Sequence, residues 1–211
     1  MSRSSGAAIT CWMPASRYAT GAAERHFVDE VMVRLRALPG VVGASVANYP
    51  PLGIIGTAVN FEIEGRPAPA PGEAMTARFR IIDQEFFRTM HVPLVKGRAF
   101  EAGDADEARG VAIVSESFAR RFFPSEDCLG KRVRPHFPGG DAFWYPQSAN
   151  LPLRIVGIAL DVHDNDIDTS ETPQMHLPYK QNPSRIVHLL VRTRGAPRDW
   201  AGSRARRHSF D

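Results

Sequence analysis

The sequence predicts an α+β fold, and three patterns lead to this prediction. Apolar residues recur at helical spacing over residues 22–38, strict alternation runs over residues 59–64, and residues 75–133 hold two copies of one strand–helix–loop unit. A period near 3.6 is typical of a helix and a period of two is typical of a strand. The 211 residues are 43% hydrophobic and 23% charged, which suits a globular protein with a core. This length allows one large domain or two small lobes.

The first predicted element is an amphipathic helix over residues 22–38. Its buried stripe comprises Phe27, Val31, Leu35 and Leu38, with Val28 and Met32 beside them. Thr20 is placed to cap the helix, Glu24 falls on the polar face, and Pro39 with the following glycine ends it. Residues 1–20 show no sustained period, so we expect them to be loose.

Two strands are predicted next, over residues 41–48 and 59–64. The second alternates strictly, with Val59, Phe61 and Ile63 on one face, as in a half-buried strand. The proline-rich residues 65–72 then form an extended connector.

The first copy of the doubled unit reads M-T-A-R-F-R-I-I, D-Q-E-F-F-R-T-M-H, V-P-L-V-K-G-R-A-F. It predicts a strand, then a helix over residues 84–90 capped by Asp83 and burying Phe86 and Phe87. The loop over residues 101–110 is acidic, and we expect it to be solvated.

The second copy predicts a strand over residues 111–114 and a helix over residues 116–123 that Pro124 stops. Ser115 is the predicted cap, and Phe118 and Phe122 are the predicted buried residues. Each copy ends in a glycine and a basic residue. Gly97 and Gly130 are expected to form turns, and Arg98 and Lys131 to be exposed or inter-lobe charges.

Three further strands are predicted over residues 153–160, 174–177 and 186–191, the first of them central because it is the most apolar. Before it, Phe143, Trp144 and Tyr145 stand in an irregular loop over residues 135–152. Three adjacent aromatic residues on a loop form either a contact surface for a partner or a plug at the end of a sheet. After the last strand, residues 195–211 are expected to be a frayed or truncated basic tail.

Charge and cysteine content exclude some classes of protein. Six arginines and only two aspartates lie from residue 192 onward, so the net positive charge of the protein belongs to its tail. We therefore expect no nucleic-acid surface on the body of the chain. Cys11 and Cys128 fit no zinc pattern, and either one disulfide or two unpaired thiols is compatible with them. No stretch approaches the about 20 apolar residues that span a bilayer, so we expect the chain itself to be soluble.

The densest polar cluster follows the strand over residues 153–160 and contains His163, Asp164, Asp166 and Asp168. The three aspartates have the spacing of a calcium loop, but Thr169 stands where the turn needs glycine, and Met175 where a bidentate glutamate is needed. A polar turn explains the cluster more simply. No nucleotide-binding glycine motif or nucleophile elbow is present. We therefore expect no enzymatic activity, and no catalytic, cofactor-binding or metal-binding residue.

Six stretches, in order, resemble the periplasmic core domain of MacB-type ABC transporter permeases (the FtsX/MacB superfamily, and within it the duplicated orphan permeases). They are L-R-A-L-P-G-V (35–41), F-E-I-E-G-R-P (61–67), E-F-F-R-T-M-H-V-P-L-V-K-G-R-A-F (85–100), V-A-I-V-S-E-S-F-A-R-R-F-F-P-S-E-D-C-L-G-K-R-V (111–133), I-V-G-I-A-L-D-V-H (155–163) and P-Q-M-H-L-P-Y-K-Q (173–181). The resemblance extends from about Met13 to Arg194.

This resemblance implies a two-lobed domain inserted between the first two membrane helices of a permease. The membrane-proximal lobe would comprise residues 21–60 and 184–194 and form a β-α-β layer, and the inserted lobe would comprise residues 61–183. It implies a non-enzymatic domain on the periplasmic face of the bacterial inner membrane that engages a periplasmic protein or cargo. Its coupling to a cytoplasmic ABC ATPase would be indirect, through membrane helices that this chain does not include. On that pattern the chain is either an excised domain or an incomplete gene product.

Insertion between adjacent helices also predicts where two segments lie. We expect the helix start near Ala22 and the strand end near Arg192 to lie at the same pole of the domain, and their lying at opposite poles would argue against this insertion.

Two alternatives come from other functional classes. One is a small divalent-metal-dependent enzyme that uses His163, Asp164 and Asp166 with the acidic loop. The other is a stand-alone ligand-binding domain.

Overall fold

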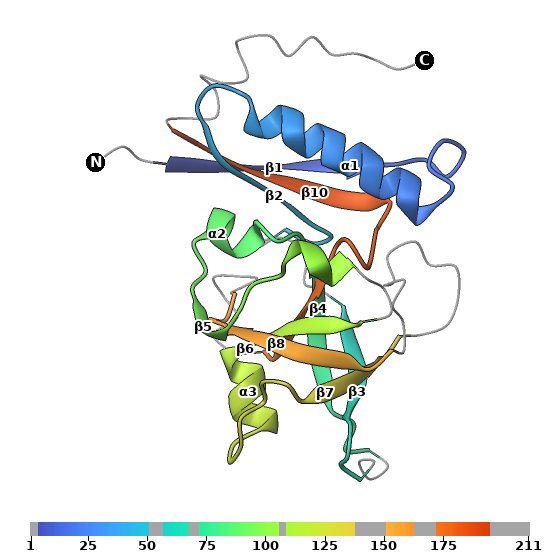
Figure 1. Ribbon diagram of the computed structural model, residues 1–211, viewed down its shortest axis with the longest axis vertical. Helices are drawn as coiled ribbons and strands as arrows, with labels where there is room; N and C mark the ends of the chain where they lie inside the picture. Colours follow the sequence, from blue (N-terminus) through green and yellow to red (C-terminus); the bar gives the residue numbers. More distant parts are fainter. Residues whose placement is uncertain are drawn as a thin grey trace.

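A computed structural model describes residues 4–50, 57–67, 72–105, 109–137, 151–162 and 172–194. Its ten strands and three α-helices confirm the predicted α+β class. The elements form two parts that are stacked along the long axis of the molecule (Figure 1).

The first part is a three-stranded antiparallel sheet that carries a helix on one face. Its strands, in spatial order, are β1 (Ser4–Trp12), β10 (Ile186–Arg194) and β2 (Val41–Ala47), and the helix is α1 (Gly21–Arg36). We call this part the helix-covered sheet. It joins the beginning and the end of the described chain, because Ser4 lies opposite Arg194 in the β1–β10 pair.

The second part is a closed ring of six strands. In spatial order they are β4 (Thr76–Ile82), β3 (Ala58–Ile63), β7 (Arg132–His136), β8 (Leu153–Ala159), β6 (Val111–Ser115) and β9 (Gln174–Pro178). The parallel pairing of β4 with β9 closes the ring. We call this part the strand ring.

Short elements lie outside the ring. They are α2 (Phe86–Met90), β5 (Leu94–Gly97), the 3-10 turn η1 (Ala102–Ala105) and α3 (Glu116–Phe122). Helix α2 packs on the face of the helix-covered sheet that α1 leaves open. A Cβ atom on Gly43 of β2 would come within 3.3 Å of the Thr89 hydroxyl of α2.

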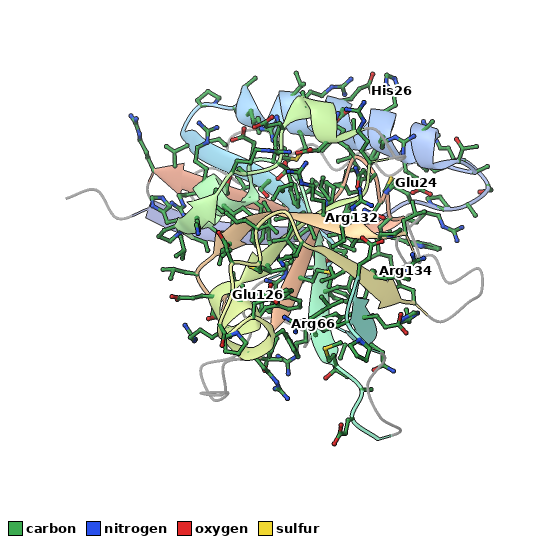
Figure 2. The ribbon with its side chains drawn as sticks, turned by 60° about the horizontal axis from the view of Figure 1, so that its bottom comes forward. Glu24, His26, Arg66, Glu126, Arg132 and Arg134 are labelled. Atoms are coloured by element: carbon green, nitrogen blue, oxygen red, sulfur yellow. The ribbon has the colours of Figure 1, made fainter. Side chains whose placement is uncertain are left out.

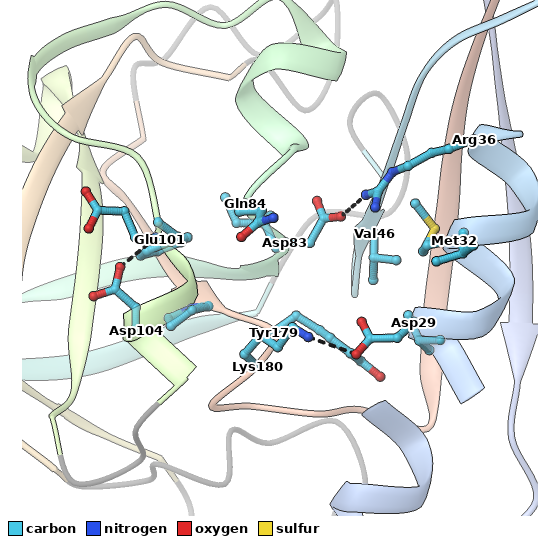
Figure 3. A pocket seen from close by; sticks show the side chains of 15 residues that line it. Asp29, Met32, Arg36, Val46, Asp83, Gln84, Glu101, Asp104, Tyr179 and Lys180 are labelled. Carbon is cyan, nitrogen blue, oxygen red and sulfur yellow. Dashed lines mark hydrogen bonds and ion pairs between the residues drawn. The ribbon is translucent and has the colours of Figure 1, made fainter. Parts of the chain in front are cut away.

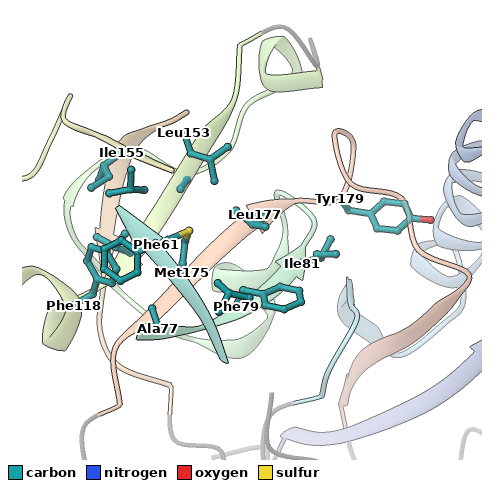
Figure 4. Close-up of a cluster of buried hydrophobic side chains, with 14 of the residues drawn as sticks. Phe61, Ala77, Phe79, Ile81, Phe118, Leu153, Ile155, Met175, Leu177 and Tyr179 are labelled. Carbon is teal, nitrogen blue, oxygen red and sulfur yellow. The ribbon is translucent and has the colours of Figure 1, made fainter. Parts of the chain in front are cut away.

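Inward-facing side chains of the strands, together with Phe118 of α3, form the core of the ring (Figure 4). Phe61, Phe79 and Phe118 are each at most 1% exposed. The rings of Phe61 and Phe118 stack with their centroids 5.0 Å apart. A buried aromatic pair of this kind contributes roughly 1 kcal/mol beyond its burial. The predicted burial of Phe118, Phe122, Phe86 and Phe87 is confirmed.

The doubled unit has the predicted turns, and its two basic side chains are partly exposed and paired with acids. Gly97 and Gly130 have φ values of 77° and 79°, which L side chains rarely adopt. Arg98 donates to Asp104 at 2.6 and 2.9 Å, and Lys131 lies 2.6 Å from Glu126. Each cation therefore neutralises a carboxylate of the loop next to it.

Residues 1–20 were wrongly expected to be loose. Residues 4–12 form β1, which pairs with β10 along its whole length. Residues 6–12 of this edge strand are all exposed or half-buried, so β1 is held mainly by backbone pairing and carries no alternating apolar face. Its pattern is therefore hard to recognise in the sequence.

The expected position of Ala22 relative to Arg192 was also wrong. Helix α1 starts beside Pro183, at one end of β10, whereas Arg194 at the other end donates its N–H to Gly40, beyond the end of α1. The chain returns through β1, so Ser4, rather than the helix start, lies beside the end of β10.

Helix α1 has the predicted cap but a shifted buried stripe. Thr20 accepts from the N–H of Ala23 at 3.2 Å. Val28 and Met32 are the most buried apolar positions, and Leu38 is 39% exposed. Glu24, expected on the polar face, is buried, and the nearby Arg185 and Arg25 offset part of the rise that burial causes in its pKa.

Candidate functional site

A cleft of about 210 Å³ separates α1 from the strand ring (Figure 3). Helix α1 and Val46 of β2 form one wall. The segment after β4, the start of η1 and the segment after β9 form the other. The walls are apolar where Val28, Met32 and Phe100 face the cleft, and charged elsewhere. The site therefore lies at the junction of the two parts of the fold.

Asp83 connects the two walls of this cleft. Its Oδ1 accepts from the Ser45 hydroxyl at 2.7 Å, and its Oδ2 accepts from Nη2 of Arg36 at 3.1 Å. The same Arg36 nitrogen donates to the carbonyl of Ala44 at 3.1 Å. Burial raises the pKa of the Asp83 carboxyl to about 6, although Ser45 and Arg36 both act to lower it. One carboxyl thus connects the ring to α1 and to β2.

This arrangement corrects the predicted role of Asp83. Glu85 occupies the cap position of α2 and makes no side-chain capping bond. Asp83 instead bonds Ser45 and Arg36, which are 38 and 47 residues away in the sequence. A capping residue is predicted from local sequence, whereas this contact depends on the tertiary arrangement.

Two more ion pairs lie at the cleft. Lys180, after β9, lies 2.8 Å from Asp29 of α1, and both side chains are half exposed. Arg98 holds the nearly buried carboxylate of Asp104, which also accepts from the N–H of Glu101 at 2.8 Å. Asp29, Asp83 and Asp104 are therefore all engaged by cations. The Asp83–Arg36 and Asp29–Lys180 pairs join the two walls of the cleft, whereas Arg98 and Asp104 both lie in the segment after β5.

A buried histidine lies beneath α2. His176 of β9 is fully buried, and its ring lies 5.2 Å from that of Phe87. Burial, and to a lesser extent the Arg80 guanidinium, lower its pKa to about 3, so the imidazole is neutral. His176 is therefore a neutral, buried residue of the protein interior.

Several predicted site residues fall outside the described part of the chain. These are the aromatic residues Phe143, Trp144 and Tyr145, and the polar residues His163, Asp164, Asp166 and Asp168. Of the acidic loop, Glu101 and Asp104 are described, and Asp104 is bound by Arg98. The described residues contain no group of three or more metal-ligating side chains.

The two cysteines are unpaired in the structure. Cys11 lies on β1, and Cys128 is buried. Burial, followed by the charge of Asp127, raises the pKa of the Cys128 thiol to about 11. This thiol is therefore protonated at neutral pH and unreactive.

The sequence model of the MacB-like periplasmic core domain matches residues 13–199. The chain belongs to this family. Its members are periplasmic domains of ABC-type transporter permeases, and this family is generally non-enzymatic. No helix in the described part of the MacB-like chain is long and apolar enough to cross a membrane. No curated protein matches the chain.

Two solved structures share this fold. The extracellular domain of the noncanonic ABC-type transporter YknZ from Gram-positive bacteria is 14% identical, with a TM-score of 0.53, over 92% of this chain and 88% of that one. The periplasmic region of MacB from Actinobacillus actinomycetemcomitans is 16% identical, with a TM-score of 0.52, over 78% of this chain. The match spans 64% of that MacB region. At these identities the likeness shows the fold alone.

Proposed function

We propose that this chain is an extracytoplasmic, non-enzymatic module of an ABC-type permease. In this proposal it engages a periplasmic partner or cargo, and it moves when the cytoplasmic ATPase hydrolyses ATP. Membership of the MacB-like family supports the first part, and the junction between sheet and ring supports the second.

The pairing of β1 with β10, the first and last described strands, supports insertion between two membrane helices. Ser4 and Arg194 are direct partners in an antiparallel pair, which places them about 5 Å apart. A domain inserted between adjacent helices needs its entry and exit close together. On this basis we propose that the helix-covered sheet is the membrane-proximal lobe and the strand ring the inserted one. The chain would cross between the two lobes near residues 47–58 and again near residues 178–186.

In this proposal the junction acts as a hinge that ion pairs hold on one side. We call the Asp83–Arg36 and Asp29–Lys180 pairs the clasp. One cross-strand pair, Ala47 with Ile82, is the only ladder contact between β2 and β4. Around it, Phe86 and Phe87 of α2 pack with Leu190 in an apolar cluster. On the α1 side, Asp83, Arg36, Asp29 and Lys180 bridge an open cleft instead. The Asp29–Lys180 pair is half exposed, and such pairs contribute little, typically below about 1 kcal/mol. Burial disfavours the charged form of Asp83 in the other pair, so in this proposal the cleft side opens while the apolar side holds.

The surface that engages the partner is proposed to include Phe143, Trp144 and Tyr145. This part of the proposal rests on the sequence alone, because the three aromatic residues lie outside the described part of the chain.

Labelling from outside the cell tests the location. In the permease that carries this domain, Cys11→Ser removes the partly accessible thiol, and Trp12→Cys introduces one at a position that is 70% exposed. A membrane-impermeant maleimide should label Trp12→Cys in intact cells. Labelling only after the inner membrane is permeabilised contradicts the proposal.

Spin labels test the coupling. Val33 on α1 and Val95 on β5 are 66% and 50% exposed, one on each side of the junction. With both replaced by labelled cysteines, the distance distribution should shift between the nucleotide-free and the ATP-bound permease. As a control, the distance between labels at Val95 and Arg121, which both lie on the strand-ring side of the junction, should not shift.

A charge reversal at the clasp sharpens this experiment. Arg36→Glu should favour the longer Val33–Val95 distance even without nucleotide, because it places two carboxylates side by side. Arg34→Glu makes the same charge change on an exposed face of α1 and should leave the distribution unchanged. Identical distributions in every nucleotide state and variant contradict coupling through this junction.

A further inference from the structure

A second hollow, of about 660 Å³, lies on the outer side of the strand ring. Its charged lining residues are Arg98, Glu101, Asp104, Arg109, Arg132 and Arg154. It is not part of the cleft at the junction, although Glu101 and Asp104 reach both.

Two of these arginines face each other across a strand pair. Arg132 of β7 lies directly opposite Arg154 of β8. The N–H of Ile155 donates to the carbonyl of Lys131 at 2.9 Å, so the two arginines form a non-hydrogen-bonded pair. In such pairs the side chains lie closest, with Cα atoms about 4.5 Å apart. Like charges in this arrangement destabilise a sheet.

The acidic residues that the structure describes around this hollow do not balance the pair. Asp104 is held by two hydrogen bonds from Arg98, and Glu101 lies 3.6 Å from the Nε of the same arginine. Arg132 has one acidic neighbour, Glu64 of the segment after β3, at 3.7 Å, which is beyond hydrogen-bonding distance.

Arg154 has still less compensation. Its backbone N–H donates to the carbonyl of Gly110 at 2.9 Å, but its exposed side chain makes no hydrogen bond or ion pair with any residue that the structure describes. Among the described residues, Arg154 therefore has no acidic partner and Arg132 has Glu64 alone, so positive charge is in excess at this wall of the hollow. Figure 2 labels Arg132 and, two residues along the same strand, Arg134.

We propose that this hollow binds an oxyanion, of the phosphate or carboxylate type, through Arg132 and Arg154. The planar guanidinium group presents two parallel N–H donors that match two oxygens of a phosphate or carboxylate. An oxyanion between the two side chains satisfies both groups and removes their mutual repulsion. Binding at this site does not depend on the proposed role in a permease.

Calorimetric titration of the purified chain at low ionic strength tests this proposal. Sodium pyrophosphate is the phosphate probe, and citrate is the carboxylate probe. Arg132→Ala and Arg154→Ala should each weaken binding of the preferred probe by at least about tenfold, the loss expected for one charge-assisted contact. Arg154→Lys, which keeps the charge without the fork, should fall between Arg154→Ala and the unchanged chain. Stronger binding of one probe than the other identifies the ligand type.

Arg134→Ala is the matched control. It removes the same charge from the same exposed side of β7, but Arg134 does not line the hollow, so binding should change less than about twofold. Pyrophosphate or citrate should also raise the thermal midpoint of the unchanged chain but not that of Arg154→Ala. Two results overturn the proposal. One is no binding of either probe when the chain, at about 1 mM, is titrated to a 10-fold molar excess of the probe. The other is equal weakening of binding by Arg134→Ala and Arg154→Ala.

Discussion

Asp83 of the ring part and Arg36 of α1 form an ion pair, with Oδ2 and Nη2 3.1 Å apart, across the junction between the two parts of the fold. The carboxyl is nearly buried, whereas 40% of the arginine side chain is exposed. Burial opposes the charge that the pair needs, and it raises the pKa of Asp83 to about 6. The pair is thus strained electrostatically, although each group has a partner.

The raised pKa makes a prediction about stability and pH. An unperturbed aspartate has a pKa near 3.9, so between about pH 4 and pH 6 folded Asp83 keeps a proton that the unfolded chain has released. Its stabilising contribution is therefore complete below about pH 4 and is lost as the pH rises through about 6. The free energy of unfolding of the unchanged chain, minus that of Asp83→Asn, should fall by up to about 3 kcal/mol from pH 4 to pH 7. Urea denaturation at several pH values measures this difference, and a constant difference contradicts the assignment.

The two turn glycines should differ in their response to alanine. Both have positive φ, which costs a non-glycine residue about 1 kcal/mol. A Cβ atom on Gly97 would also lie 2.4 Å from the carbonyl oxygen of Val156, whereas one on Gly130 meets nothing within 4 Å. Gly130→Ala should therefore lower the free energy of unfolding by about 1 kcal/mol, and Gly97→Ala by roughly 3 kcal/mol or more. Chemical denaturation compares them, and equal losses would mean that β5 moves away from β8 without cost.

The ion pairs around the cleft should differ in strength. Asp104 is 9% exposed and receives two hydrogen bonds from Arg98, so Asp104→Ala should cost about 2–3 kcal/mol. Asp29 is half exposed and has one pair with Lys180, so Asp29→Ala should cost less than about 1 kcal/mol. Thermal unfolding of the two variants measures this contrast. A larger loss for Asp29→Ala contradicts it.

The two helix caps provide a further matched pair. Thr20 caps α1 at the surface with one bond. Ser115 is fully buried, and its hydroxyl accepts from the N–H groups of Phe118 at 3.2 Å and Gln174 at 3.0 Å. Thr20→Ala should cost about 1 kcal/mol. Ser115→Ala should cost about 2–3 kcal/mol, because it leaves two buried donors without this acceptor. Urea midpoints of the two variants decide between this expectation and equal costs.

The sequence by itself determined the elements whose signals are local. Alternation identified β3 through Phe61, the capping pattern identified the starts of α1 and α3, and the glycines marked the turns at Gly97 and Gly130. These features depend on residues within a few positions of one another. The six ordered stretches also indicated the family, which the match over residues 13–199 confirms.

Only the tertiary structure decided which distant residues meet. Strand β1 has no recognisable period and is held by β10, about 180 residues later. The local sequence around Asp83 is typical of a helix cap, but in the folded chain its carboxylate accepts hydrogen bonds from Ser45 and Arg36 instead. Arg132 and Arg154 became neighbours only because β7 pairs with β8 in one register. Long-range pairing and burial are properties of the folded chain, so no local pattern of residues records them.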